Sequence, residues 1–268
     1  MSDSRTDVRS TPLAAIDAAR WRIVNFLQAL FLMSWTALMI STALAAFALT
    51  WSSRIPLAMA RHAWAPPLLR AAGARLRVTG TEHLDGVKAC IFVSNHQSMI
   101  DIAVVFAAVP VNLRFVAKKI LAYVPFLGWY MWAMGMVFVD RSKRAQAIDS
   151  LKKAGALIRA GAHVIAFPEG TRSRDGRILP FKKGIFMLAL EAGVPIVPMA
   201  IDGAIKVLPS DGFRVRPGEI RVALGAPIET AGLTADDRDV LIKRVHDAVI
   251  DLHRSIGGAG GDKDHAVG

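Results

Sequence analysis

The chain has 268 residues, of which 53% are hydrophobic, and its formal net charge is +11. That length suits one large domain with an appended segment, and the basic balance favours an anionic partner such as a phosphorylated metabolite, an acidic lipid headgroup or nucleic acid. The single cysteine, Cys90, excludes an internal disulfide and a paired-cysteine metal site.

The first apolar stretch follows a polar lead-in, residues 1–22, which we expect to be mobile. Residues 23–51 form a run of 29 without a charge, more than the roughly 20 that a helix needs to cross a bilayer. Asn25 and Gln28 near its start also fit a helix that enters one leaflet obliquely. The stretch therefore predicts membrane attachment, either by a full span or by insertion into one leaflet.

A second, shorter helical segment at 55–72 mixes basic and apolar residues and is interrupted by Pro66 and Pro67. Such a pattern is typical of an amphipathic piece at a membrane surface, with Trp64 at the level of the headgroups. We therefore interpret residues 23–72 as membrane-attachment helices.

The rest of the chain alternates between short apolar runs and helical patterns, which is typical of an α/β domain. Strands are expected at 74–79, 89–93, 113–117, 136–139, 164–167, 195–201 and 220–224. Helices are expected at 145–160, 183–192 and 234–254, the last opened by a capping box of Thr234 and Asp237. The predicted fold is a layered α/β domain over 73–256, with a mixed, mostly parallel sheet flanked by helices, behind an N-terminal membrane-embedded helical segment.

Two stretches fall outside this pattern. Residues 120–139 carry no charge over 20 positions, but a bilayer span there would put His96 and the motif at 167–173 on opposite sides of the membrane. We therefore expect a partly buried or interfacial segment instead. Residues 257–268 are Gly-rich and polar, which predicts a disordered tail.

A histidine and an aspartate stand five positions apart in the turn after the strand at 89–93. His96 would lie where the chain turns from strand to helix, so Asp101 can accept its ring N–H while the other nitrogen takes a proton. His246 and Asp251 have the same spacing inside a continuous helix, where the two side chains point roughly 140° apart, and we expect both on the helix surface. Spacing alone leaves His96 either catalytic or structural.

A second polar motif, Phe167 to Ser173, also follows a buried strand. Its glycine permits close approach of a ligand, its carboxylate can accept hydrogen bonds from hydroxyl groups, and its arginine can bind phosphate through two parallel hydrogen bonds. The motif opens a basic segment in which a single acidic residue, Asp175, stands among five cations: Arg172, Arg174, Arg177, Lys182 and Lys183. A solvated basic loop is the competing interpretation, above all for Arg174 and Arg177.

Together the two motifs resemble the membrane-associated glycerolipid acyltransferases, and within them the 1-acyl-sn-glycerol-3-phosphate acyltransferases. The resemblance covers residues 80–201 through four blocks in the family's order: 95–101, 135–141, 167–172 and 194–198. Val137 and Val139 stand where the family often has isoleucine, a difference that affects none of the implied functional residues.

The resemblance implies roles for individual residues. His96 and Asp101 would be catalytic, and the phosphorylated glycerol acceptor would be bound by Glu169, Gly170, Thr171 and Arg172. A lysine after the strand at 113–117 would help to hold the phosphate; Lys118 matches it best, with Lys119 as the neighbouring candidate. No metal and no cofactor is implied, only acyl-CoA or acyl-carrier protein as co-substrate.

The implied reaction is acyl transfer from that thioester to the sn-2 hydroxyl of 1-acyl-sn-glycerol 3-phosphate, giving phosphatidic acid for phospholipid biosynthesis. The partners would be lysophosphatidic acid and an anionic bilayer surface, with the catalytic domain on the cytoplasmic side of the inner membrane. The chain has no GxSxG motif and no candidate catalytic thiol, so direct transfer is expected. Backbone N–H groups at the start of the helix after Ser98 would stabilise the oxyanion.

Other functions stay open at this point. The acceptor could be glycerol 3-phosphate or another lysolipid, such as a lyso-ornithine lipid. One alternative is a membrane-docked lipid-binding protein without turnover, which would need neither His96 nor Asp101. Another is a hydrolase that uses water at His96, although the sequence contains no nucleophile elbow and no cluster of metal ligands. Nucleic-acid binding would explain the positive charge but not the apolar stretches, so we expect no nucleic-acid partner.

Overall fold

A computed structural model describes residues 12–139 and 154–268. Asp140 and Arg141, which end the second block, lie outside the described residues, as does the first part of the helix expected at 145–160. Residues 154–159, which are described, are helical.

A seven-stranded sheet forms the centre of the domain, in the order β1-β7-β6-β2-β5-β3-β4. The strands are β1 (Ala74–Thr79), β2 (Ile91–Ser94), β3 (Leu113–Lys118), β4 (Val137–Val139), β5 (His163–Ala166), β6 (Ile196–Asp202) and β7 (Gly218–Leu224). The five strands from β6 to β4 run parallel, whereas β7 pairs antiparallel with β6, and β1 pairs parallel with β7. The mixed, mostly parallel sheet predicted from the sequence is confirmed.

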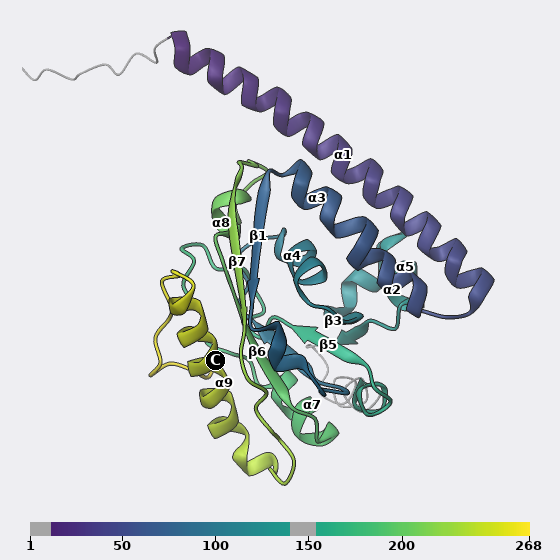
Figure 1. The fold of residues 1–268 in the computed structure, drawn as a ribbon, viewed down its shortest axis with the longest axis vertical. Helices are drawn as coiled ribbons and strands as arrows, with labels where there is room; N and C mark the ends of the chain where they lie inside the picture. The colour runs from purple at the N-terminus through teal and green to yellow at the C-terminus, as the bar shows by residue number, and fades with distance from the viewer. Residues whose placement is uncertain (1–11, 140–153) are drawn as a thin grey trace, which may run out of the picture.

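Helices cover both faces of this sheet (Figure 1). On one face lie α3 (Ala65–Ala71), α4 (Asp101–Ala108) and α5 (Leu127–Ala133), and on the other lie α7 (Gly184–Ala192) and α9 (Arg238–Ser255). Strand β2 faces both layers, since Phe92 packs in one core cluster, and Ile91 and Val93 in the other. This explains why residues 89–93 are an unbroken apolar run rather than an alternating one.

Shorter elements connect these layers: α2 (Arg54–Met59), η1 (Ala60–Trp64), η2 (Thr81–Leu84), η3 (Lys119–Tyr123), α8 (Ala204–Val207) and η4 (Ala235–Asp237). The predicted capping box at η4 is confirmed, because Asp237 accepts the Thr234 N–H at 2.8 Å and the Thr234 hydroxyl accepts from Asp236. The 120–139 stretch forms η3, α5 and β4, and α1 is the one helix in the described ranges long and apolar enough to cross a membrane.

Helix α1 (Pro12–Thr50) begins within the expected lead-in. Residues 12–22 are helical because proline suits the first position of a helix and the following residues are rich in alanine. The helix runs along the outside of α2 and α3 (Figure 1). Asn25 exchanges hydrogen bonds with the backbone of Val215, both at 3.1 Å, and Gln28 donates to the Ala71 carbonyl at 2.9 Å.

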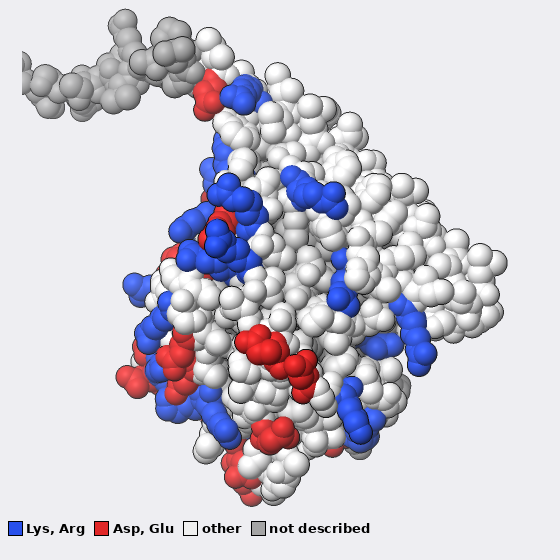
Figure 2. All heavy atoms as spheres, in the orientation of Figure 1, with Lys and Arg blue, Asp and Glu red and all other residues white. Residues whose placement is uncertain are grey.

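The outer face of α1 is apolar and exposed. Its ridge is almost free of charged side chains, most of which gather elsewhere on the domain (Figure 2). The large apolar side chains at least half exposed on it are Ile16, Ile23, Phe26, Leu27, Leu30, Met33, Leu38 and Leu49. Such a continuous apolar surface on a folded protein marks a site of contact with lipid or protein.

One face of the segment at 55–72 is packed into the protein, and its contact with a membrane surface stays a prediction. Leu57 and Ala65 are at most 1% exposed, and the Trp64 indole donates to the Thr36 hydroxyl of α1 at 3.0 Å. The prolines do not break the segment: the turn before them widens into the π-helical η1, since proline offers no N–H and clashes with the carbonyl four residues earlier.

The C-terminal residues 257–268, expected to be disordered, lie against the loop after β5. The N–H of Ile178 donates to the Gly260 carbonyl at 2.9 Å, and the N–H of Phe181 donates to the Ala266 carbonyl at 2.9 Å. Ala266 is only 5% exposed. The composition of the tail suggested disorder, but its backbone forms strand-like hydrogen bonds that this composition does not reveal.

Candidate active site

The carboxyl ends of three parallel strands bring the predicted site residues to one edge of the sheet. Val93 of β2 is in register with Ala166 of β5, and Phe115 of β3 is in register with Ile165. His96 and Glu169 each lie three residues after the first of these pairs, in the loops that follow β2 and β5, and so stand at the same level. Function at such an edge is common in open α/β sheets.

His96 and Asp101 form the pair that their spacing predicts. His96 Nδ1 lies 2.8 Å from Asp101 Oδ2, and the Asp101 side chain is completely buried, whereas that of His96 is 14% exposed. The same oxygen accepts the backbone N–H groups of Gln97 at 2.7 Å and Ser98 at 2.8 Å. Since three donors converge on one oxygen, the carboxylate is fixed, the His96 ring carries its proton on Nδ1, and Nε2 is left as the basic nitrogen.

His246 and Asp251 do not meet, as their position within α9 predicts. His246, however, is fully buried and packs edge-on against the ring of Phe181 at 4.7 Å between centroids, so its expected surface position is wrong. Burial lowers the pKa of the His246 ring, and the Asp247 charge opposes that shift.

Phe167, the first residue of the second motif, packs flat on the His96 ring. The centroids are 4.2 Å apart and the planes differ by 14°. Sequence reasoning placed Phe167 in the motif but did not assign it this contact. The contact could have been predicted from the position of Phe167 directly after β5, which pairs with β2, the strand that His96 follows.

Glu169 lies behind the turn rather than on an open surface. It is 3% exposed, and its Oε1 accepts the His96 backbone N–H at 3.0 Å. Burial raises the pKa of Glu169 to about 8, the nearby Asp101 charge acts in the same direction, and the His96 N–H acts against it. This contact makes Glu169 a support of the turn that bears His96; its implied contact with the acceptor stays a prediction.

The remaining predicted binding residues lie around the same edge. Gly170 adopts a positive φ of 72°, which lets the chain turn sharply after Glu169. Thr171 is exposed, Arg172 is half-buried, and Lys118 is exposed at the end of β3. Within the described ranges, no side-chain hydrogen bond or ion pair engages Arg172 or Lys118, so both cations are available to an anion; Lys119 does have an interaction.

Buried polar side chains that sequence reasoning did not single out hold the turn in place. Asn95 exchanges two hydrogen bonds with the Ile201 backbone of β6, at 2.8 and 2.9 Å. The Gln97 amide donates to the Gly176 carbonyl at 3.1 Å and contacts His253 of α9 at 3.0 Å. Only the polarity of these residues, directly beside His96, marked them in the sequence.

Other chemistries find little support in the described ranges. No group of three or more His, Cys, Asp or Glu residues there could hold a metal ion. Cys90 is fully buried, and burial raises the pKa of its thiol to about 12, so it is not a thiolate nucleophile. Among the backbone N–H groups after Ser98 that are expected to stabilise an oxyanion, that of Ile100 donates to the Ser98 hydroxyl and that of Asp101 to the Ser98 carbonyl, both at 3.2 Å. The role of this helix start in stabilising the oxyanion stays a prediction.

A family model described as Acyltransferase matches residues 75–202, the part of the chain that holds this sheet edge and the His–Asp pair, and so gives the class of the protein. The chain is 41% identical over 179 residues to a 1-acyl-sn-glycerol-3-phosphate acyltransferase of Limnanthes douglasii, covering 66% of this chain and 63% of that protein. It is 34% identical over 194 residues to the alpha form from Homo sapiens, covering 71% of this chain and 69% of that protein. The chain belongs to the 1-acyl-sn-glycerol-3-phosphate acyltransferase family.

A solved structure shares the fold. The crystal structure of the 1-acyl-sn-glycerophosphate (LPA) acyltransferase PlsC from Thermotoga maritima matches with a TM-score of 0.75 and 27% identity, over 88% of this chain and 97% of that one. The chain covers slightly less than two thirds of the plant relative and 62% of a yeast relative.

Proposed function

We propose that this protein transfers an acyl group from an acyl thioester to the sn-2 hydroxyl of 1-acyl-sn-glycerol 3-phosphate and so makes phosphatidic acid. The observation that carries the proposal is the 2.8 Å contact between His96 Nδ1 and Asp101 Oδ2, beside the basic loop after β5. The relatives named for this activity support it. Either acyl-CoA or acyl-carrier protein can supply the thioester.

His96 acts as the general base in this reaction. Its Nε2 removes the proton from the glycerol hydroxyl as the oxygen attacks the thioester carbonyl, and the collapse of the tetrahedral intermediate expels the thiolate, which takes the proton back from the imidazolium. Asp101 holds the tautomer and stabilises the charged ring, and Phe167 keeps the ring plane fixed. The acyl group thus passes directly to the acceptor without an acyl-enzyme.

Arg172 and Lys118 bind the phosphate of the acceptor. Both cations follow strands on the same side of β2, and no ion pair with another described residue occupies either. A guanidinium and an ammonium converging on one phosphate give charge-assisted hydrogen bonds, which are stronger than neutral ones. The acceptor hydroxyl is then directed towards His96.

Helix α1 holds the protein on the membrane by lying in one leaflet rather than by crossing the bilayer. Its contacts with the domain extend from Asn25 to Phe47, a distance of about 33 Å along a helix. The hydrocarbon core is about 30 Å thick, so a spanning α1 would draw the α/β domain itself into the bilayer. An in-plane α1 instead leaves its apolar outer face in lipid and the domain in water.

The proposed function is tested by acyl transfer from labelled acyl-CoA and acyl-carrier protein to lysophosphatidic acid, for the wild type and His96→Ala at equal membrane-bound protein. Phosphatidic acid made by the wild type and lost in the variant supports the acceptor and the base together. Equal rates would show that His96 is not the base. No phosphatidic acid from either donor would refute the acceptor, and glycerol 3-phosphate and lyso-ornithine lipid would be tried next.

A further inference from the structure

A cavity of about 520 Å³ lies beside the turn that carries His96. Three segments form its walls: the loop after β5, helix α8 and the connection from α8 to β7. The lining residues are Arg174, Ile205, Pro209, Ser210, Asp211 and Arg214. Its volume falls within the range of roughly 300–1,000 Å³ that is usual for small-molecule sites.

Two of its walls are bonded to the catalytic turn. Arg174 follows Ser173, whose N–H donates to the His96 carbonyl at 2.8 Å. Pro209 follows Leu208, whose carbonyl accepts the Ser98 hydroxyl at 2.5 Å. Two lining residues, Arg174 and Pro209, therefore each directly follow a residue that is hydrogen-bonded to the turn.

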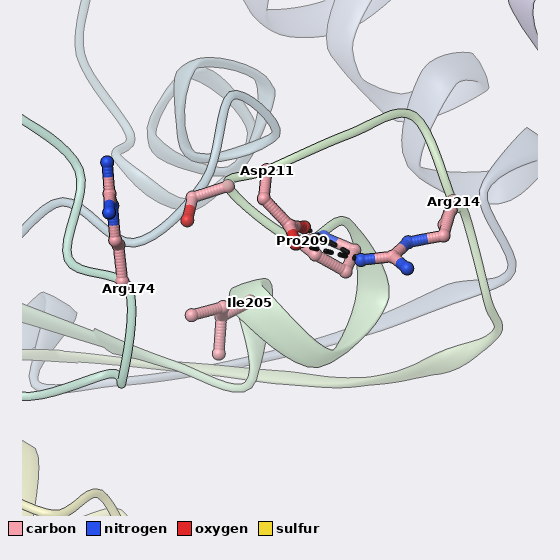
Figure 3. A pocket seen from close by; sticks show the side chains of 6 residues that line it. Arg174, Ile205, Pro209, Asp211 and Arg214 are labelled. Atoms are coloured by element: carbon pink, nitrogen blue, oxygen red, sulfur yellow. Dashed lines mark hydrogen bonds and ion pairs between the residues drawn. The ribbon is translucent and has the colours of Figure 1, made fainter.

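The lining combines two guanidinium groups with a small apolar surface. Figure 3 shows Arg174 and Arg214 on opposite sides of the hollow, with Asp211 and Pro209 between them and Ile205 on α8. Arg214 uses only Nη2 for Asp211, at 2.8 and 3.0 Å from its two oxygens, so Nε and Nη1 stay free for another acceptor. Asp211 thus pairs with Arg214 without using all of its donors.

The charge of the cavity favours a single anionic group. Two arginines oppose one carboxylate, and no hydrogen bond or ion pair to another described residue engages the Arg174 side chain. A phosphate can be bound by both guanidiniums and the Ser210 hydroxyl, while Ile205 and Pro209 suit an aliphatic chain attached to it. The chemistry fits a phosphate ester whose attached chain is partly apolar.

The cavity and Lys118 lie on different sides of β2. Helix α8 and the connection to β7 follow β6 on one side of β2, whereas Lys118 follows β3 on the other, and Arg174 shares the loop after β5 with Glu169 and Arg172. His96 follows β2 itself and so lies between the β6 side and Lys118. A transferase that joins two substrates needs them on either side of its base.

We propose that this cavity binds the phosphate of the 4′-phosphopantetheine arm that carries the acyl thioester. Acyl-CoA and acyl-carrier protein share this group, so one site serves both donors. The inference rests on the proposed acyl transfer and adds to it the place where the donor is held.

Steady-state kinetics of the full-length protein in membranes test the site. Arg174→Gln and Arg214→Gln should each raise KM for the acyl donor about tenfold, as loss of one charge-assisted hydrogen bond predicts, and leave KM for the acceptor unchanged. Arg177→Gln is the matched control, because Arg177 lies in the same loop with a side chain 73% exposed but does not line the cavity. A donor KM unchanged in both variants would overturn the site.

Inhibition by free 4′-phosphopantetheine identifies the group bound. It should compete with the donor, whereas pantetheine without phosphate should not, and the competition should be lost in Arg174→Gln and Arg214→Gln. If the variants change kinetics with acyl-CoA but not with acyl-carrier protein, the cavity binds the nucleotide end and the assignment to the shared arm fails. If the variants make phosphatidic acid with an unchanged KM for the donor, the donor site in the cavity is wrong but the proposed function stands. If the wild type makes no phosphatidic acid, the proposed function itself is wrong.

Discussion

The Gln97 amide nitrogen lies 3.0 Å from His253 Nε2, a buried contact between residues 156 positions apart. Both residues are at most 1% exposed. The other nitrogen of His253 accepts the Gly260 N–H at 3.0 Å, and the same Gln97 amide donates to Gly176. Because Nδ1 of His253 accepts the Gly260 N–H, Nε2 carries the ring proton and does not accept from the Gln97 amide. Gln97 therefore bonds the turn that carries His96 to the loop after β5 and packs it against His253 of helix α9, which in turn accepts from the C-terminal tail.

Replacing Gln97 should slow turnover without weakening substrate binding. Gln97→Ala removes the tie beside His96, and a small displacement of a catalytic base is costly, so kcat should fall about ten- to hundredfold. Both KM values should stay within about twofold of the wild type. Initial rates over both substrates, with Tm measured in parallel, distinguish this from general unfolding; a raised KM at unchanged kcat would contradict the positioning role.

Asp101→Asn should be far more damaging than its small change in size suggests. An amide cannot accept all three N–H donors that now converge on Oδ2, and its NH₂ group favours the wrong tautomer of His96. By analogy with the triad aspartate, kcat should fall by about three to four orders of magnitude. The rate of phosphatidic acid formation at saturating substrates measures this, and a loss below tenfold would remove Asp101 from the mechanism.

Glu169→Gln should stabilise the protein at alkaline pH. The pKa of Glu169 rises from 4.5 to about 8 on folding, so the folded state keeps a proton that the unfolded state releases, and stability falls as pH rises from about 4.5 to 8. A glutamine cannot ionise yet still accepts the His96 N–H. We expect the variant to be at least about 1 kcal/mol more stable than the wild type at pH 8 and nearly equal at pH 4.5. Denaturant unfolding of both proteins at pH 4.5 and pH 8 measures their free energies of unfolding. If the difference in free energy between variant and wild type is the same at both pH values, the pKa of Glu169 is not raised.

Removal of residues 261–268 should destabilise the protein although their composition is that of a flexible tail. The deletion removes the hydrogen bonds from Phe181 to Ala266 and from Gly268 to Phe181, at 2.9 and 3.0 Å, and exposes buried apolar surface beneath Ala266. A loss of about 1–3 kcal/mol is expected. Lys263→Ala serves as the control, because it breaks only a surface ion pair with Asp251 and should cost less than about 1 kcal/mol. Equal Tm values for the deletion and the wild type would show that the tail does not pack.

Charges on the outer face of α1 should release the protein from membranes. Leu30 and Met33 are 55% and 71% exposed on that face, so Leu30→Glu with Met33→Glu places two carboxylates in the proposed lipid contact without disturbing the domain. Val240→Glu on α9, at 73% exposure, is the control on another surface. Sedimentation with phospholipid vesicles should show the double variant in the supernatant and the control in the pellet. Retention of the double variant on vesicles would place the lipid contact elsewhere.

Features that depend on neighbouring residues could be predicted from the amino-acid sequence. The apolar run at β2 predicted a buried strand, the turn after it predicted the meeting of His96 and Asp101, and Thr234 with Asp237 predicted the start of the closing helices. Each of these rests on contacts within about five positions, where residue types and spacing restrict the backbone to few conformations.

Features that join distant segments became visible only in the folded protein. In the folded protein, Glu169 contacts the His96 backbone, and His246 and His253 are buried. The segment 55–72 packs beneath α1, and the tail lies against the loop after β5. The fold also forms the cavity of Arg174 and Arg214 from segments that are far apart in the chain. Polarity and composition do not reveal these positions, because the free energy of burial depends on which partners the fold brings close, not on the residues next to each position in the chain.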